Sequence, residues 1–156
     1  MAARPATQSI FESARAVVAV DTSVLVDLLG GDIHADASHA SLRAALVEGP
    51  VVVCDVVLSE LVAGLGPRSS LLDTLDEIGI GYAAINELAA VRAGEMQRRY
   101  NARRAAAGRA PASMRTVPDF LIGAHALLQC QGLITRDAGF FRDYFKGLKL
   151  VVPKAA

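Results

Sequence analysis

The chain has 156 residues, with as many acidic as basic side chains and a formal net charge of zero. Its composition, 53% hydrophobic and 21% charged, is that of a folded globular domain and excludes a disordered chain. The length suits one domain with an ordinary apolar core, and the balanced total charge gives no sign of a polyanionic partner.

A compact β-branched run is the first clear element of the chain. Residues 1–14 have weak periodicity and are expected to form an N-terminal extension, loosely ordered or a short helix. Residues 16–20 are typical of a buried strand. The polar sequence Asp21-Thr-Ser23 then opens a helix that ends at Gly30-Gly31. Because the apolar run is short and Asp21 follows it directly, we do not expect a secretory signal.

The rest of the chain alternates helices and strands. In chain order we expect a helix at 37–48, a strand at 51–54, helices at 56–65 and 70–78, a strand at 79–85, a helix at 86–107, a loop at 108–117, a helix at 119–131, a strand at 132–135, a helix at 140–145 and a strand at 148–152. Most of the strands are continuously apolar, as in a parallel sheet that is covered on both faces. The predicted fold class is therefore a three-layer α/β/α domain with a central, mainly parallel sheet.

The cysteines and histidines give no sign of a zinc site or of a nucleophilic centre. Cys54 and Cys130 lie far apart in apolar stretches, as expected for buried thiols in a reducing compartment. Neither has a histidine at metal-ligand spacing. No segment has the roughly 18 apolar residues that a membrane span needs. We expect a cytoplasmic protein that is not bound to a membrane.

Four carboxylates fall where a parallel sheet collects its ligands, at the carboxyl ends of the strands. Asp21 and Asp137 follow predicted strands, Asp119 lies in the first turn of a helix, and Glu60 is the only charge in the helix at 56–65. Each has an ordinary alternative role. Asp21 is placed to cap a helix, Asp119 to complement a helix dipole, Asp137 to form a turn, and Glu60 to face solvent or pair with an arginine.

Taken together, the four acids favour a metal site. Carboxylates gathered at one edge would repel one another if left bare, and a hard divalent cation relieves that repulsion. Oxygen ligands alone indicate Mg²⁺ or Mn²⁺. The matching chemistry is hydrolysis of a phosphodiester.

A basic segment precedes Asp119. Residues 92–115 contain seven arginines and one acid. Such a strip could contact phosphates, although a solvated helix face remains an equal alternative. The candidate RNA-binding residues are Arg98, Arg99, Arg103, Arg104 and Arg115.

Four short motifs resemble those of the PIN domain family. They are a hydrophobic strand followed by Asp21-Thr-Ser23, Ser59-Glu60-Leu61 followed by Gly64, Pro118-Asp119-Phe-Leu-Ile-Gly-Ala-His-Ala126, and Leu133-Ile-Thr-Arg-Asp137 with Phe140. No single motif is specific, but their order and spacing together are. Among small PIN domains, the chain is most similar to VapC-type toxins of bacterial toxin–antitoxin pairs.

This resemblance implies a PIN-like nuclease domain over residues 15–153 that acts as a metal-dependent endoribonuclease. Asp21, Glu60, Asp119 and Asp137 match the acidic positions, and Ser23 and Thr135 match hydroxyl positions that orient ligands or water. The implied cofactor is Mg²⁺ or Mn²⁺. The implied partners are an RNA substrate, a cognate antitoxin and a second copy of the chain.

Other functions remain open from the sequence. One is a PIN-like module that binds RNA or protein without catalysis, and another is a housekeeping nuclease that processes RNA or DNA. A phosphorylation-controlled signalling module would need paired acids after the first strand, whereas Asp21 stands alone there. We further expect Asp27 and Asp143 to face solvent, Asp55 to cap its helix, and His125 to be packed rather than catalytic.

Overall fold

The computed structural model describes residues 17–108 and 117–154, and within them the predicted fold class is confirmed. The described residues form a five-stranded sheet with the strand order β3-β2-β1-β4-β5, and every neighbouring pair is parallel. The strands are β1 (Val18–Val20), β2 (Val51–Val53), β3 (Ile80–Tyr82), β4 (Gly132–Ile134) and β5 (Lys149–Val151).

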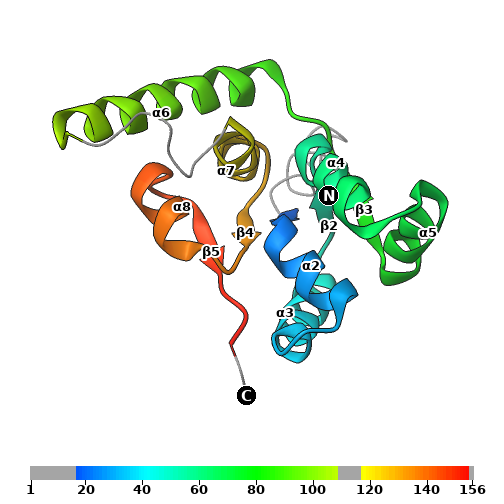
Figure 1. Cartoon of the computed structure of the whole chain (residues 1–156). Coiled ribbons are helices and arrows are strands. Elements are labelled where there is room, and N and C mark those ends of the chain that lie inside the picture. The colour runs from blue at the N-terminus through cyan, green and yellow to red at the C-terminus, as the bar shows by residue number, and fades with distance from the viewer. Residues whose placement is uncertain (1–16, 109–116, 155–156) are drawn as a thin grey trace, which may run out of the picture.

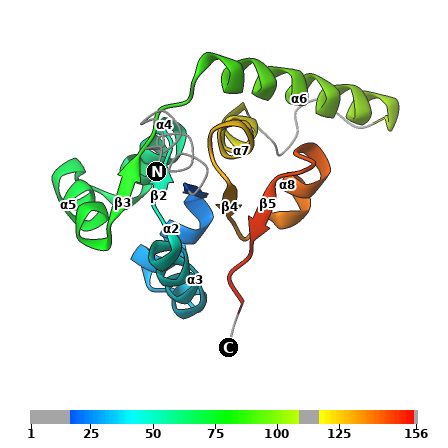
Figure 2. The same cartoon turned by 180° about the vertical axis from the view of Figure 1, so that it is seen from behind.

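The helices connect these strands and cover both faces of the sheet. They are α2 (Thr22–Gly30), α3 (Ala35–Glu48), α4 (Asp55–Leu65), α5 (Arg68–Ile78), α6 (Glu87–Ala106), α7 (Val117–Gln129) and α8 (Ala138–Tyr144). In Figure 1, α2 and α3 lie on one side of the strands, and α6, α7 and α8 lie on the other. Figure 2 shows the same arrangement from behind.

The predicted elements are all present, with shifted ends. Each strand has three residues in the ladder, and the residues that follow leave the sheet at the end of the strand. Helix α7 begins two residues earlier than predicted because Pro118 is well accommodated in a first helical turn. The predicted extension at 1–14 and most of the predicted loop at 108–117 lie outside the described residues.

The order of the strands creates a switch point between β1 and β4. From β1 the chain proceeds to β2 and β3 on one side, and it then returns to β4 and β5 on the other. The connections that leave β1 and β4 at their carboxyl ends therefore diverge, which opens a crevice between them. The residues that follow these two strands, Asp21 and Thr135, are placed at this crevice by the fold itself.

Aromatic side chains hold α6, α7 and α8 together. The Phe120 ring of α7 is fully buried, and its centroid lies 5.6 Å from that of Tyr100 in α6 and 5.8 Å from that of Tyr144 in α8. Both contacts are edge-to-face, a favourable arrangement for aromatic rings. Phe120 immediately follows Asp119, so this cluster also fixes one candidate site residue.

Phe145, directly after α8, leaves no space for a side chain at Gly123 of α7. A Cβ atom at this position would lie 2.3 Å from the ring of Phe145, a buried side chain. We expect Gly123→Ala to lower the free energy of unfolding by about 1–3 kcal/mol, the usual range for overpacking a core. Urea unfolding followed by circular dichroism measures the change.

The matched control is Gly94→Ala in α6, where a Cβ atom would meet nothing within 4 Å. Because alanine is the better helix former, we expect this change to raise the stability by up to about 1 kcal/mol. Equal effects of the two substitutions would show that the contact between Gly123 and Phe145 is not tight.

Candidate active site at the carboxyl edge of the sheet

Asp21 is the buried centre of the candidate site. It follows β1, its side chain is buried, and it occupies the position before α2 without making a side-chain cap. Its Oδ2 instead accepts hydrogen bonds from Thr135 Oγ1 at 2.7 Å and from Ser23 Oγ at 3.1 Å. The hydroxyls predicted to orient ligands are therefore the two that hold Asp21.

The strand register explains why Thr135 reaches Asp21. Val20 and Ile134 are register partners in β1 and β4, and the Asp21 backbone N–H donates to the Ile134 carbonyl at 2.9 Å. The next residue of each strand therefore lies beside the other. Thr135 Oγ1 also accepts from the Asp137 backbone N–H at 3.0 Å, which ties Asp137 to the same network.

Glu60 lies on an adjacent helix at the surface. Glu60 is exposed, which agrees with the alternative prediction that it faces solvent. Its Oε1 nevertheless accepts a hydrogen bond from Thr22 Oγ1 at 3.1 Å. A cavity of about 330 Å³ between α4 and the start of α7 includes Glu60 and Pro118 in its lining. Thr22 is thus a site residue that the sequence analysis did not assign.

Three of the four acids interact electrostatically. Burial raises the pKa of Asp21, hydrogen bonds from Thr135 and Ser23 oppose that rise, and the negative charge of Asp119 adds to it. The pKa of Glu60 is also raised, chiefly by desolvation and further by Asp21 and Asp119, while the Thr22 hydrogen bond opposes the rise. Asp21, Glu60 and Asp119 therefore lie close enough to repel one another.

These residues suit a hard divalent cation by charge and by donor type. A cation would offset both the burial of Asp21 and the mutual repulsion, and carboxylate and hydroxyl oxygens are its preferred ligands. In the part of the chain that the structure describes, no three His, Cys, Asp or Glu side chains are already arranged to hold a metal ion. Asp119 and Asp137 are half-buried, and both take part in other interactions.

An ion pair beneath the site corrects one prediction. Asp27 was expected to face solvent, but its side chain is 1% exposed because the Arg136 guanidinium covers it. Arg136 Nη2 lies 2.7 Å from Asp27 Oδ1, Arg136 Nε pairs with Oδ2, and Ser38 Oγ donates to the same carboxylate at 3.4 Å. The Arg136 backbone N–H donates to Ser23 Oγ at 3.4 Å. This pair joins α2 to the segment between Thr135 and Asp137.

The other predictions for individual residues are mostly confirmed. His125 is buried and Asp143 is exposed, as expected. The prediction for Asp55 was wrong, because Cys54 occupies the cap position of α4 and the Asp55 carboxylate accepts from the Ile85 backbone N–H at 3.3 Å. Of the two thiols expected to be buried, Cys54 is buried and Cys130 is half-buried, and burial raises the pKa of the Cys130 thiol to about 12.

The arginines of α6 separate into different environments. Arg99 and Arg103 line a cavity next to α8, and Arg103 also stacks on Tyr144. Arg104 stacks on Tyr100, and Arg98 is exposed. Arg115 lies outside the described residues.

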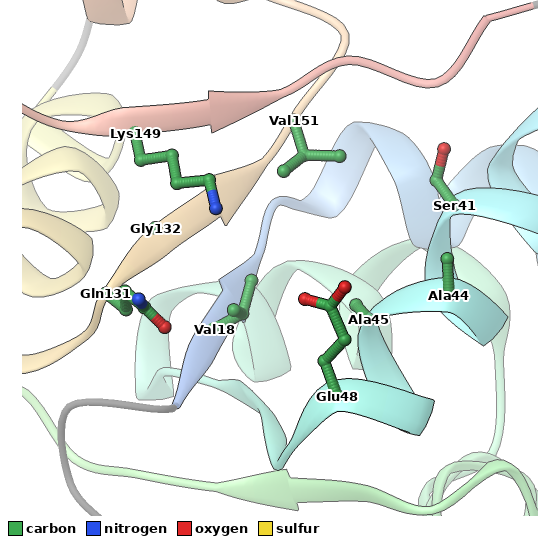
Figure 3. Close-up of a pocket in the computed structure, with 9 residues that line it drawn as sticks. All are labelled: Val18, Ser41, Ala44, Ala45, Glu48, Gln131, Gly132, Lys149 and Val151. Atoms are coloured by element: carbon green, nitrogen blue, oxygen red, sulfur yellow. The ribbon is translucent and has the colours of Figure 1, made fainter. Parts of the chain in front are cut away.

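A third cavity, of about 370 Å³, lies between α3 and the strands β1, β4 and β5. Val18, Gly132 and Lys149 begin β1, β4 and β5, and all three line it. Figure 3 shows the Lys149 amino group and the Glu48 carboxylate pointing into it. None of the four candidate carboxylates is among its lining residues, so this cavity is separate from the carboxylate site.

The fold and the site together define a class of protein. It is a parallel α/β domain that presents carboxylates at the switch point of its sheet. Residues 18–146 match the PIN domain family, and the chain belongs to that family. Comparison with curated proteins gave no match.

Solved structures of similar fold include a toxin–antitoxin complex. One similar chain is in VapBC2 from Rickettsia felis bound to a promoter DNA fragment, with 18% identity, a TM-score of 0.64, and coverage of 88% of this chain and 99% of that one. Another is in a toxin–antitoxin complex from Klebsiella pneumoniae, with 21% identity, a TM-score of 0.58, and coverage of 89% and 99%. A third is in FitAcB from Neisseria gonorrhoeae, with 21% identity, a TM-score of 0.56, and coverage of 87% and 97%.

The Asp27–Arg136 pair generates a stability prediction. Asp27→Asn removes the charge from the carboxylate that Arg136 covers, so we expect the free energy of unfolding to fall by about 2 kcal/mol. Asp73→Asn, a change at an exposed position of α5, should alter it by less than about 0.5 kcal/mol. Urea denaturation of both variants tests the pair, and a loss no larger for Asp27→Asn than for Asp73→Asn would contradict it.

His125 generates a pH prediction. Burial lowers the pKa of its imidazole, which hydrogen-bonds the Ala83 backbone while Nε2 has no partner among the described residues. Below about pH 6.5 the imidazole therefore binds a proton in the unfolded chain but remains neutral in the folded chain. The free energy of unfolding falls as the pH falls through this range.

We expect His125→Leu to flatten the decline of stability between pH 7 and pH 5, with the exposed His39→Leu as the control. Thermal unfolding across that range gives the comparison. An unchanged slope in His125→Leu would show that this imidazole does not contribute.

Proposed function

We propose that the protein is a metal-dependent endoribonuclease of the VapC type, the toxin of a toxin–antitoxin pair. The observation that carries the proposal is the buried Asp21 carboxylate, held by Thr135 and Ser23 within electrostatic range of Asp119 and Glu60. Membership of the PIN domain family supports a nuclease, and the toxin–antitoxin complexes of similar fold support the toxin role.

Asp21, Glu60, Asp119 and Asp137 would hold Mg²⁺ or Mn²⁺. A divalent ion at this position supplies positive charge to the phosphodiester and makes water a stronger nucleophile at neutral pH. The protein groups prepare this chemistry. Thr135 and Ser23 fix the orientation of Asp21, and the Asp137 backbone is fixed by the same Thr135 hydroxyl. Thr22 directs Glu60 toward the sheet edge.

Repulsion among the acids of the metal-free site favours the binding of a cation. The raised pKa values of Asp21 and Glu60 mean that their ionised forms are disfavoured in the folded protein without a counter-charge. Binding of a divalent ion would remove that penalty and stabilise the fold.

The proposed setting follows from the proposed role. A toxin of this type acts on RNA in the cytoplasm, forms a homodimer, and is silenced by an antitoxin protein that covers its site. Among residues 17–108 and 117–154, no helix combines the length and the apolar composition of a membrane span.

The decisive variant is Asp21→Asn, which keeps the size of the side chain and an oxygen that can accept from Thr135. We expect it to abolish cleavage of bacterial RNA in Mg²⁺ or Mn²⁺, whereas Asp36→Asn, at an exposed position of α3, should cleave at the parental rate. The assay is gel analysis of total RNA with metal and with chelator, beside single-stranded DNA of matched sequence.

A second readout does not depend on activity. At 100 times its dissociation constant, a bound cation should stabilise the parental protein by about 2.7 kcal/mol, and the same cation should shift the melting temperature of Asp21→Asn much less. Cleavage by Asp21→Asn at the parental rate would overturn the four-carboxylate proposal. A folded parental protein that binds the cation but cuts no RNA would favour a binding module.

A further inference from the structure

A row of cations lines one side of α6, apart from the carboxylate site. Arg92, Arg99 and Arg103 lie on one stripe of the helix together with Met96, at the spacing that usually carries apolar residues. All four line a cavity of about 330 Å³ between α6, α7 and α8. The core stripe of the same helix, Ala89, Ala93, Met96 and Tyr100, lies next to this row and shares Met96 with it.

The cavity is strongly positive. Lys146, just after α8, joins the three arginines, and Asp143 is the one carboxylate among its lining residues. Four cations therefore face one anion. Arg92 also lies 3.8 Å from Glu95, a surface pair whose contribution is small. Arg99, Arg103 and Lys146 are exposed, so their charges are available to a ligand.

The shape of the row fits a linear polyanion. Arg92 and Arg103 are eleven residues apart, which is about 16 Å along a helix axis. Guanidinium groups match phosphate oxygens in a two-pronged geometry. Arg103 lies 5.3 Å from the centre of the Tyr144 ring, and this stacking holds one end of the row in place.

The row leads away from the candidate active site. The end of α7 meets the start of α6, since Gln129 hydrogen-bonds Ala84 and Asn86, whereas Phe120 near the start of α7 contacts Tyr100 further along α6. The Arg103 end therefore lies near Asp119, and the Arg92 end lies near the far end of α7. Tyr144 lines the cavity and contacts Phe120, the neighbour of Asp119.

We propose that this cavity binds the phosphate backbone of the RNA substrate on one side of the cut, with Arg99, Arg103, Arg92 and Lys146 as its phosphate contacts. The inference rests on the proposed ribonuclease function and assigns it a substrate-binding site distinct from the carboxylates. A strand held along this row meets the acids at its Arg103 end. The contacts are to the phosphate backbone, so binding does not depend on base identity.

The test uses the full chain carrying Asp21→Asn, so that the RNA stays intact. The pocket variant adds Arg99→Gln and Lys146→Gln, two exposed positions on different elements. The control adds Arg43→Gln and Arg68→Gln, exposed positions of α3 and α5 that give the same change in net charge. Figure 1 shows α3 across the sheet from α6. Fluorescence anisotropy measures binding of a labelled single-stranded RNA at several salt concentrations.

We expect the pocket variant to bind roughly tenfold more weakly at low salt, and its slope of log affinity against log salt to fall by about 1.4, which is 0.7 for each lost phosphate contact. The control should stay within about twofold of its parent. Unfolding temperatures close to that of the parent, as exposed positions predict, separate lost contacts from lost structure.

Three outcomes would overturn the inference. Equal losses of RNA affinity in the pocket variant and the control would show that the effect comes from net charge and not from this cavity. Unchanged RNA binding in the pocket variant, with loss of binding to a polyglutamate peptide, would assign the cavity to an acidic protein segment. Failure of the Asp21→Asn parent to bind any RNA would overturn the inference, whereas the proposed function is tested separately by RNA cleavage with the parental protein, so the two failures are distinguishable.

Discussion

The candidate site depends on one hydrogen bond, from the Thr135 hydroxyl to the Asp21 carboxylate, 2.7 Å long and buried. Two residues 114 positions apart meet there because β1 and β4 are parallel neighbours in register. Neighbouring interactions extend from this contact. Ser23 holds the same carboxylate oxygen, and the Thr135 oxygen accepts from the Asp137 backbone. A buried carboxylate is unfavourable alone, so the hydroxyls, and in our proposal a cation, are what allow it to stay ionised in the folded protein.

The two sides of the molecule serve the site differently. On the α2 side, the Asp27–Arg136 ion pair joins α2 to the segment after β4 and so holds these two parts of the site together. The opposite side positions Asp119 through Phe120, whose ring is enclosed by the aromatic side chains of α6 and α8. In our proposal that side also carries the basic row that guides the substrate. Hydrophobic packing and electrostatic attraction thus act on adjacent stripes of one helix, α6.

Much of this could be predicted from the sequence, and the exceptions have physical causes. Continuous apolar runs indicated buried parallel strands, and the acids that follow them indicated the edge where Asp21 and Thr135 lie. Asp27 is the only charge on the apolar helix α2, as Glu60 is between Val56 and Leu65, and such a charge needs a partner where it is buried. Glu60 is exposed, whereas Asp27 is buried under Arg136. A sequence does not show which face of a short helix points inward when both faces are apolar. The hydrogen bonds from Thr22 to Glu60 and from Ile85 to Asp55 join distant segments, so no local pattern predicts them.

The register of β1 and β4 also limits how this chain can evolve in length. Successive side chains of a strand point to opposite faces, so one residue gained or lost within either strand would exchange the faces of everything after it. In β4 such a change would remove Thr135 from Asp21 and present a neighbour in its place. Chain-length variation among descendants of this protein should therefore collect in the connections on the side of the sheet away from Asp21. The three-residue strands β1 and β4 should be inherited without insertion or deletion.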